Sequence, residues 1–116
     1  MKGTYIGELE ELILLTVGIL YGKAYAVAVM DEIAKQTGRD LNISAVHAVL
    51  TRLEEKGFLK SEMGESTSER GGRRKRIYTI TAYGRKVLTA ARDFKMGLWN
   101  QFPDFATGKL SFGPSS

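Results

Sequence analysis

Apolar residues recur at helical spacing in two segments of the N-terminal part of the chain. Between Glu8 and Leu20 they follow the i, i+3, i+4, i+7 spacing of a helix that buries one face, and glutamates occupy its first turn. A second helix is expected from about Tyr25 to Thr37, where Gly38 is placed to end it in a left-handed conformation. The side chains predicted to be buried are Leu9, Leu12, Ile13, Thr16, Val17 and Leu20 in the first helix and Val27, Met30, Ile33 and Ala34 in the second.

The most regular pattern lies in residues 42–57. Asn42 is a suitable N-cap, because its side-chain oxygen can accept a hydrogen bond from a free amide of the first turn, and Gly57 provides the C-terminal stop. The predicted apolar stripe is Val46, Val49, Leu50 and Leu53. The opposite face carries mostly small residues: Ser44, Ala45, Ala48, Thr51, Arg52 and Glu55. Small side chains allow a helix to approach another surface closely, as a groove-binding helix must, although an ordinary solvent-exposed helix is the alternative.

Two short segments of alternating apolar and polar residues, 59–63 and 76–80, predict a two-stranded hairpin. Residues 64–75 connect them, whereas hairpin connections usually have about two to five residues. A connection this long inside a compact domain is commonly functional or disordered. Its cations lie next to the second strand, and a polar tip is expected at Ser66, Thr67 and Ser68.

A final helix is expected from Thr81, which can serve as its N-cap, to Phe102. The residues that recur at helical spacing are Val87, Leu88, Ala91, Phe94, Lys95, Leu98 and Phe102. Once the earlier elements have closed a core, the outer part of this stripe, with Trp99, lacks an obvious partner in the same chain. Exposed aromatic stripes usually mark an interface, and a two-fold axis is the simplest way to cover one. The tail beyond Pro103 shows no periodicity and is expected to be partly disordered.

Composition limits the chemistry that this chain can perform. Its 116 residues suit one compact domain, and the absence of cysteine excludes disulfides and Cys-based zinc or iron–sulfur sites. The single histidine, His47, has Ser44 within helical reach but no evident acidic third member for a catalytic triad. Residues 18–23 resemble a phosphate loop but are one residue short and follow a helix instead of a strand. We therefore expect neither an enzyme nor a cofactor or metal.

The apolar run from Leu12 to Met30 requires a test of the membrane alternative. Lys23 would lie near the bilayer centre, and the Tyr-Gly-Lys at 21–23 fits a turn between two helices better than the middle of one span. The N-terminal residues also lack the layout of a signal peptide. A cytoplasmic protein without membrane association is the expectation.

The net charge of +4 is unevenly distributed. Residues 1–65 carry 7 Lys/Arg against 10 Asp/Glu, a balance of −3, while residues 66–116 carry 10 against 3, a balance of +7. Within residues 70–76, five of seven positions are cationic. Such a stretch suits nucleic acid or an acidic surface, because like charges this close repel one another unless a polyanion or solvent compensates them. A short basic loop without function is the alternative.

Three motifs carry a resemblance to a known family. They are Gly7-Glu-Leu-Glu-Glu-Leu-Ile-Leu-Leu, then Val46-His-Ala-Val-Leu-Thr-Arg-Leu-Glu-Glu-Lys-Gly57, and finally Glu69-Arg-Gly-Gly-Arg-Arg-Lys-Arg-Ile-Tyr78 running into Thr81-Ala-Tyr-Gly84-Arg85. In this order and at these separations the sequence resembles the PadR-like transcriptional regulators, in a short form with one C-terminal helix. The resemblance covers roughly residues 7–88. It implies a mainly α fold with a small β-hairpin, namely a winged helix-turn-helix followed by a dimerisation helix.

The resemblance also implies a function and a division of the chain. It implies a homodimeric, sequence-specific DNA-binding repressor that leaves its double-stranded operator when a small-molecule effector binds or the dimer changes shape. Residues 1–80 would form the DNA-binding domain, 81–102 the dimerisation helix and 103–116 the tail. The residues expected nearest the DNA are Ser44, Ala45, His47, Ala48, Thr51 and Arg52 on the third helix and Arg73, Arg74 and Lys75 on the wing. Those expected at the dimer interface or an effector pocket are Leu88, Ala91, Leu98, Trp99 and Phe102.

This sequence departs from the family pattern at four positions. His47 stands where a tyrosine is usual on the third helix, and the other departures are Ala26, Ile43 and Ala82. The tyrosine position is associated with DNA contact, so a shorter imidazole changes what can be reached there. In some short members an aromatic residue of the last helix lines a drug-binding pore, a role open to Trp99 beside plain dimer packing.

Two other functions are compatible with parts of the pattern. A winged-helix protein-interaction module would bind a protein partner and show no salt-steep DNA binding. A single-stranded RNA binder normally offers stacking aromatics beside its basic patch, and apart from Tyr78 the basic loop has none nearby.

Overall fold

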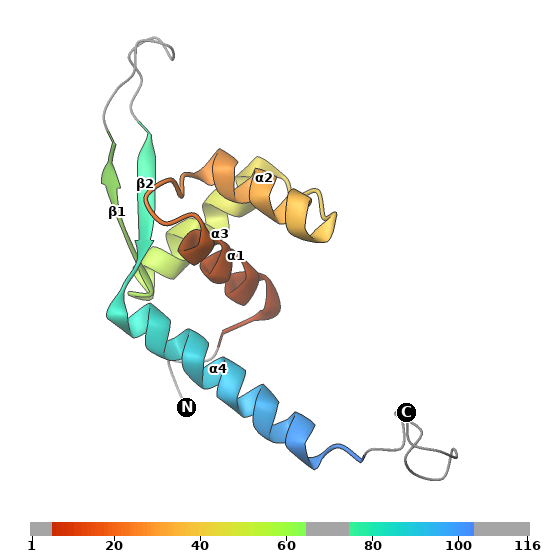
Figure 1. Ribbon diagram of the computed structural model, residues 1–116. Helices are drawn as coiled ribbons and strands as arrows, with labels where there is room; N and C mark the ends of the chain where they lie inside the picture. The colour runs from red at the N-terminus through yellow and green to blue at the C-terminus, as the bar shows by residue number, and fades with distance from the viewer. Residues whose placement is uncertain (1–5, 65–74, 104–116) are drawn as a thin grey trace.

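Four helices and one antiparallel hairpin make up the described part of the chain, residues 6–64 and 75–103 of a computed structural model (Figure 1). The elements are α1 (Glu8–Ile19), α2 (Ala26–Thr37), α3 (Ile43–Glu55), β1 (Leu59–Met63), β2 (Arg76–Ile80) and α4 (Ala82–Gln101). This order confirms the predicted winged helix-turn-helix with a C-terminal helix. Arg73, Arg74, the polar tip at 66–68 and residues 104–116 lie outside the described residues.

The helix ends follow the capping residues that the sequence offered. Asn42 accepts a hydrogen bond from the amide of Ser44 at 2.7 Å at the start of α3, and Thr81 accepts one from the amide of Gly84 at 3.0 Å at the start of α4. Gly38 ends α2 with a φ of 78°, a left-handed conformation that glycine adopts without steric cost. The predicted boundaries of α1, α2, α3 and both strands are accordingly confirmed within one or two residues.

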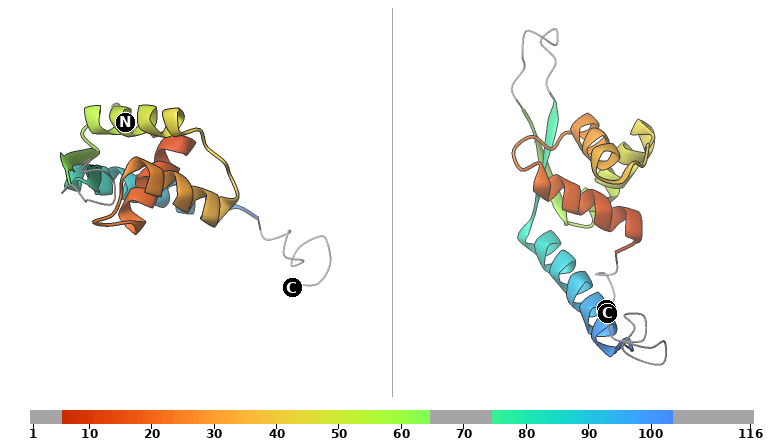
Figure 2. Two further views of the ribbon diagram at one scale, coloured as in Figure 1. Left: turned by 90° about the horizontal axis from the view of Figure 1, so that it is seen from above. Right: turned by 45° about the vertical axis from the view of Figure 1, so that its right-hand side comes forward.

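Helices α1, α2 and α3 enclose a core that the hairpin and the first turns of α4 complete (Figure 1 and Figure 2). The largest fully buried side chains are Ile13, Leu14, Val17, Val29, Ile33, Val46, Leu50, Leu53 and Phe58. All four residues of the predicted α3 stripe are buried, which confirms the orientation of that helix. From this unit α4 extends away, as both figures show.

The predicted buried face of α2 is partly wrong. Val27 is 49% exposed, while Val29 and Ala26 are buried with Ile33. Apolar residues fill every position from 26 to 30, so periodicity alone could not decide which of them faces α1 and α3. The same ambiguity hid Leu14, which is fully buried in the apolar run of α1.

The hairpin is joined to the helical unit along one edge of β2. Within the hairpin, Ser61 of β1 lies opposite Tyr78 of β2. The amide of Tyr78 donates a hydrogen bond of 2.9 Å to the carbonyl of Ala24, in the turn between α1 and α2. The Tyr78 side chain is buried. Its burial, helped by the nearby Glu54 carboxylate and opposed by Arg76, raises the pKa of the Tyr78 phenol. A buried Tyr78 is no stacking platform for single-stranded RNA.

The start of α4 is held against the turn between α3 and β1. The Thr81 hydroxyl donates to the carbonyl of Gly57 at 2.7 Å, and the Thr81 amide donates to the carbonyl of Phe58 at 3.0 Å. In the first turn of α4, the backbone of Gly84 lies so close to Phe58 that a Cβ at position 84 would overlap the Phe58 carbonyl. The Tyr83 ring meets the Phe58 ring edge to face, with centroids 5.2 Å apart. We call these contacts the α4 junction.

Gly84→Ala is expected to destabilise the protein by about 1–3 kcal/mol, because backbone at the α4 junction must shift to admit a methyl group. Gly97→Ala is the matched control in the same helix, since a Cβ there meets nothing within 4 Å. Removing that helix-interior glycine should stabilise the protein by up to about 1 kcal/mol. Urea denaturation of both variants measures the difference, and a Gly84→Ala variant as stable as the wild type would contradict the close approach.

Candidate nucleic-acid interface

The outer face of α3 is exposed along its whole length. Every α3 residue expected near DNA is exposed: Ser44, Ala45, His47, Ala48, Thr51 and Arg52. From Ser44 to Thr51 this face carries no carboxylate and no Lys or Arg. It therefore offers hydroxyls, methyl groups and one imidazole to a closely approaching surface, and charge enters only at its C-terminal end.

Under that end of α3 lies a buried carboxylate that is not among the residues predicted from the sequence. Glu10 of α1 is 8% exposed, and its carboxylate accepts hydrogen bonds from the Lys56 ammonium at 2.9 Å and from the Gly7 amide at 3.0 Å. The Arg52 guanidinium lies 3.7 Å from the same carboxylate. Burial raises the pKa of Glu10, but the Gly7 hydrogen bond and the two cations lower it more, so that the pKa falls below its ordinary value.

This arrangement changes what Arg52 can contribute. Its side chain remains half exposed, but the Glu10 carboxylate compensates part of its charge and draws it toward α1. Glu10 at the same time caps the first turn of α1 and holds Lys56 just beyond the end of α3. The carboxylate therefore links α1 to the C-terminal end of α3.

Two side-chain hydrogen bonds link the hairpin to α3. Ser61 of β1 donates to the Glu54 carboxylate at 2.8 Å, and Arg76 of β2 donates to the Ser61 hydroxyl at 3.1 Å. At the loop end of the hairpin, just before β2, the Lys75 ammonium lies 3.8 Å from the centre of the Tyr25 ring. Of the three wing residues expected near DNA, Lys75 is thus the one whose surroundings are described.

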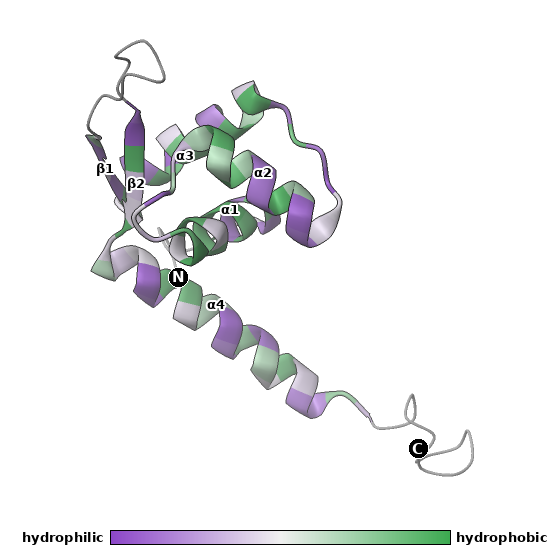
Figure 3. Cartoon of the chain, turned by 45° about the horizontal axis from the view of Figure 1, so that its top comes forward, coloured by the Kyte–Doolittle hydropathy of each residue, from purple (hydrophilic) through white to green (hydrophobic). Residues whose placement is uncertain are grey.

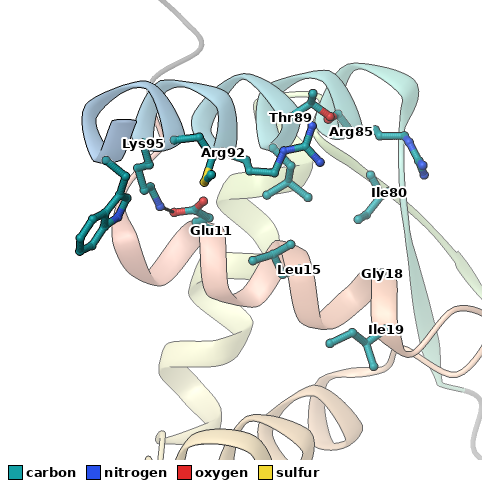
Figure 4. Close-up of a pocket in the computed structure, with 12 residues that line it drawn as sticks. Glu11, Leu15, Gly18, Ile19, Ile80, Arg85, Thr89, Arg92 and Lys95 are labelled. Carbon is teal, nitrogen blue, oxygen red and sulfur yellow. Dashed lines mark hydrogen bonds and ion pairs between the residues drawn. The ribbon is translucent and has the colours of Figure 1, made fainter. Parts of the chain in front are cut away.

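A groove of about 760 Å³ lies between α1 and α4 (Figure 4). Its apolar lining includes Leu15, Ile19, Leu88 and Trp99. Figure 4 shows Glu11 of α1 and Lys95 of α4 pointing toward one another across it, with nitrogen and oxygen 2.6 Å apart. Arg85 and Arg92 also line the groove, so its rim is mainly cationic.

The outer half of α4 exposes the residues expected at an interface. Trp99 is 64% exposed, Leu98 and Phe102 are also exposed, and Leu88 and Ala91 are half-buried. Trp99 and Phe102 meet edge to face with ring centroids 5.3 Å apart, and together with Leu98 and Lys95 they line a second, smaller hollow. Figure 3 shows hydrophobic positions alternating with hydrophilic ones along this helix where it leaves the core. Such exposure is typical of a surface that another chain covers.

The described residues contain no cluster of metal-ligating side chains and no membrane-spanning helix. Within 6–64 and 75–103, no three His, Asp or Glu side chains come together in a way that could hold an ion. In the same ranges, none of the helices is long and apolar enough to cross a membrane.

The contacts that were not predicted differ in whether the local sequence gives any sign of them. Glu10 stands at the third helical position after Gly7, where a carboxylate can reach back to the N-cap amide, so its cap was predictable. Its bond to Lys56 joins residues 46 positions apart and depends on how α1 and α3 pack. The contacts of Ser61 with Glu54 and of Tyr25 with Lys75 likewise follow from packing and had no local signal.

The chain matches a known protein family. A model described as the transcriptional regulator PadR-like family matches residues 14–90. A PadR-like transcription factor from Bacteroides fragilis is 26% identical, with a TM-score of 0.67 over 80% of this chain and 84% of that one. A PadR family transcriptional regulator from Eggerthella lenta is 25% identical, with a TM-score of 0.64 over 81% of each chain.

A third similar structure was determined with DNA. It is Bacillus subtilis PadR in complex with operator DNA, 20% identical, with a TM-score of 0.59 over 72% of this chain and 45% of that one. At this identity the likeness shows the fold alone. Among curated proteins none matches this chain.

Glu10→Gln is expected to lower the free energy of unfolding at pH 7 by about 1–2 kcal/mol, because the buried charge-assisted contacts to Lys56 and Arg52 are weakened. Since the folded pKa of Glu10 is depressed, the stability that its ionisation contributes is present above the unfolded value near 4.5 and is lost as the pH falls through the folded pKa. The difference between variant and wild type should therefore shrink as the pH falls below about 4.

Glu8→Gln is the matched control in the same helical turn, because Glu8 is exposed and its ion-pair partner Arg39 is 3.8 Å away. Its effect should be close to zero. Urea denaturation at several pH values separates the two. A Glu10→Gln difference that persists unchanged at pH 3 would contradict the assigned role.

Proposed function

Because the chain belongs to the PadR-like family of transcriptional regulators, we propose that it is a homodimeric repressor that binds a specific DNA operator and leaves it when an effector binds. The observation that carries the DNA-binding part is the exposed, small-residue face of α3, which has no charged side chain from Ser44 to Thr51. Such a face can approach base edges closely, and its polar groups can form hydrogen bonds there.

On this proposal α3 enters the major groove. Ser44 and His47 contact base edges or phosphates near the N-terminal end of the helix, and Thr51 can bond to a base or place its methyl group against thymine. Ala45 and Ala48 permit the close approach. The operator complex of Bacillus subtilis PadR, which shares this fold, supports the proposal.

The wing supplies the electrostatic part of binding. Arg73 and Arg74 contact phosphates or the minor groove, as the charge pattern of residues 70–76 predicts. Arg52, partly compensated by Glu10, holds a phosphate at the groove edge in this proposal and is not the principal base contact. In this proposal the phosphate contacts position the protein on the DNA, and the α3 face distinguishes one base sequence from another.

Two copies associate through α4. The exposed residues Leu98, Trp99 and Phe102 provide the apolar surface, with Leu88 and Ala91 nearer the core. We assign residues 1–80 to the DNA-binding domain, 81–102 to the dimerisation helix and 103–116 to a tail. The groove between α1 and α4 adjoins this surface, so an effector held there can change how α4 is placed.

The second candidate function is a winged-helix module that binds a protein instead of DNA. The mainly cationic rim of the α1–α4 groove favours an acidic partner for such a module. The two functions differ in salt dependence, because release of counterions makes DNA affinity fall steeply with salt.

Ala48→Glu is expected to weaken DNA binding by at least about tenfold, because it places a carboxylate on the α3 face that approaches phosphates. The position is exposed, so folding should be unaffected. Lys35→Gln, on an exposed position of α2, makes the same change of one charge unit and should have little effect. Fluorescence anisotropy measures both, and equal affinities for the two variants would remove α3 from the interface.

Arg73→Ala with Arg74→Ala is expected to weaken DNA binding and to reduce the slope of log K against log salt by about 0.9 for each lost phosphate contact. The double variant Lys35→Ala with Lys86→Ala removes two cations from exposed positions of α2 and α4 and should leave the slope unchanged. An unchanged slope in the arginine double variant would exclude the wing from the DNA contacts.

Trp99→Glu is expected to shift the protein from dimer to monomer, because a charge in the apolar surface of α4 is desolvated on association. Asn100→Glu introduces the same charge at the next residue, which lines neither α4 hollow, and should leave the dimer intact. Sedimentation velocity over a range of concentrations distinguishes the two. A dimer that is equally stable in both variants would place the interface elsewhere.

A further inference from the structure

One backbone hydrogen bond ties β2 to the turn before α2, and another joins the two sides of the hairpin at the loop end of its strands. The amide of Tyr78 donates to the carbonyl of Ala24 at 2.9 Å, and the amide of Gly64 donates to the carbonyl of Lys75 at 2.6 Å. The backbone of Lys75 is thereby fixed where β2 begins, close to the start of α2.

The Lys75 side chain has a specific partner at that place. Its ammonium lies 3.8 Å from the centre of the Tyr25 ring, well inside the distance of about 6 Å at which a cation is attracted to an aromatic face. Both residues are half-buried. Tyr25 is the N-cap residue of α2, and its carbonyl accepts the first hydrogen bond of that helix from Val29 at 2.9 Å, so the ring is carried by a rigid element.

A phosphate contact would require Lys75 to leave this ring. Lysine binds phosphate as a mobile point charge, whereas here the charge already lies over a fixed aromatic face at the root of the wing. The same contact joins β2 to α2, and Glu54 with Ser61 joins β1 to α3. Each side of the hairpin is therefore attached to a helix, the β1 side to α3 and the β2 side to α2.

We propose that Lys75 tethers the wing to α2 and makes no phosphate contact, and that Tyr25 is the positioning residue that holds it. The proposal rests on the proposed DNA-binding function for its effect on affinity, but the tether itself exists without DNA. It replaces the role in DNA contact that the sequence suggested for Lys75.

The tether is tested first in the free protein by NMR. A methylene group next to an ammonium that lies over a ring is shifted upfield by the ring current, so the Lys75 Hε resonance should lie upfield of the other lysines. Tyr25→Phe should keep this shift, because the ring remains, and Tyr25→Leu should abolish it. An ordinary Lys75 Hε shift in the wild type, or one unaffected by Tyr25→Leu, would overturn the tether whether or not the protein binds DNA.

The effect on DNA binding is tested by titrations at several salt concentrations. Lys75→Met and Tyr25→Leu should each lower the affinity by about two- to fivefold, and the double variant should be no weaker than either single one, because both remove the same contact. The slope of log K against log salt should stay that of the wild type. A slope smaller by about 0.9 in Lys75→Met would show a phosphate contact and overturn the proposal.

Thermal unfolding of the variants identifies any loss of folded protein, and Tyr25→Phe should match the wild type in both affinity and slope. A Tyr25→Phe variant as weak as Tyr25→Leu would assign the effect to the hydroxyl and contradict a cation–ring contact.

Discussion

The close approach of the Gly84 backbone to the Phe58 carbonyl is the constraint on which the arrangement of this molecule depends. Phe58 lies between α3 and β1, and Gly84 lies in the first turn of α4. The Thr81 hydroxyl fastens the same place by donating to the Gly57 carbonyl while it caps α4. Because only a glycine fits at position 84, the first turn of α4 can pack directly against the backbone of Phe58. The α4 junction therefore relates three parts of the protein: α3, the hairpin and the long helix.

In the proposed function, this geometry relates the dimer contact to DNA binding. If two copies join through α4, the junction transmits the placement of that helix to α3, and the spacing of two α3 helices follows from it. Any ligand that alters the packing of α4 on α1 must then act on the same junction. The adjacent carboxylates Glu10 and Glu11 contribute to this connection, since one bonds to Lys56 beyond the end of α3 and the other to Lys95 of α4.

The two parts of the candidate interface, the outer face of α3 and residues 70–76, differ in charge. The outer face of α3 has no charged side chain before Arg52, and Glu10 compensates part of the Arg52 charge. The strongest cationic segment is residues 70–76. In the proposed function, this distribution assigns attraction of DNA mainly to the wing and discrimination of sequence to the fit of the small-residue face of α3. The net charge of +4 is therefore a property of one segment more than of the whole surface.

Much of the fold could be predicted from local patterns. Asn42, Thr81 and Gly38 mark helix ends through hydrogen bonds or backbone conformations that a single residue provides, and the structure confirms them. The face of α2 could not be predicted, because Val27 and Val29 are equally apolar and only tertiary packing chooses between them. The candidate site divides in the same way. The exposed face of α3 follows from periodicity, while the partners of Arg52 and Lys75 lie in other elements and emerge only when those elements pack.

The most direct test of a DNA-binding function is an equilibrium titration of the full chain by fluorescence anisotropy. The labelled duplexes are the DNA upstream of its own gene and a scrambled sequence of the same composition, each at several salt concentrations. A sequence-specific repressor should bind the upstream DNA more tightly, and for both duplexes log K should fall linearly with log salt. Absence of binding to either duplex at low salt, where attraction to phosphate is strongest, would contradict a DNA-binding function.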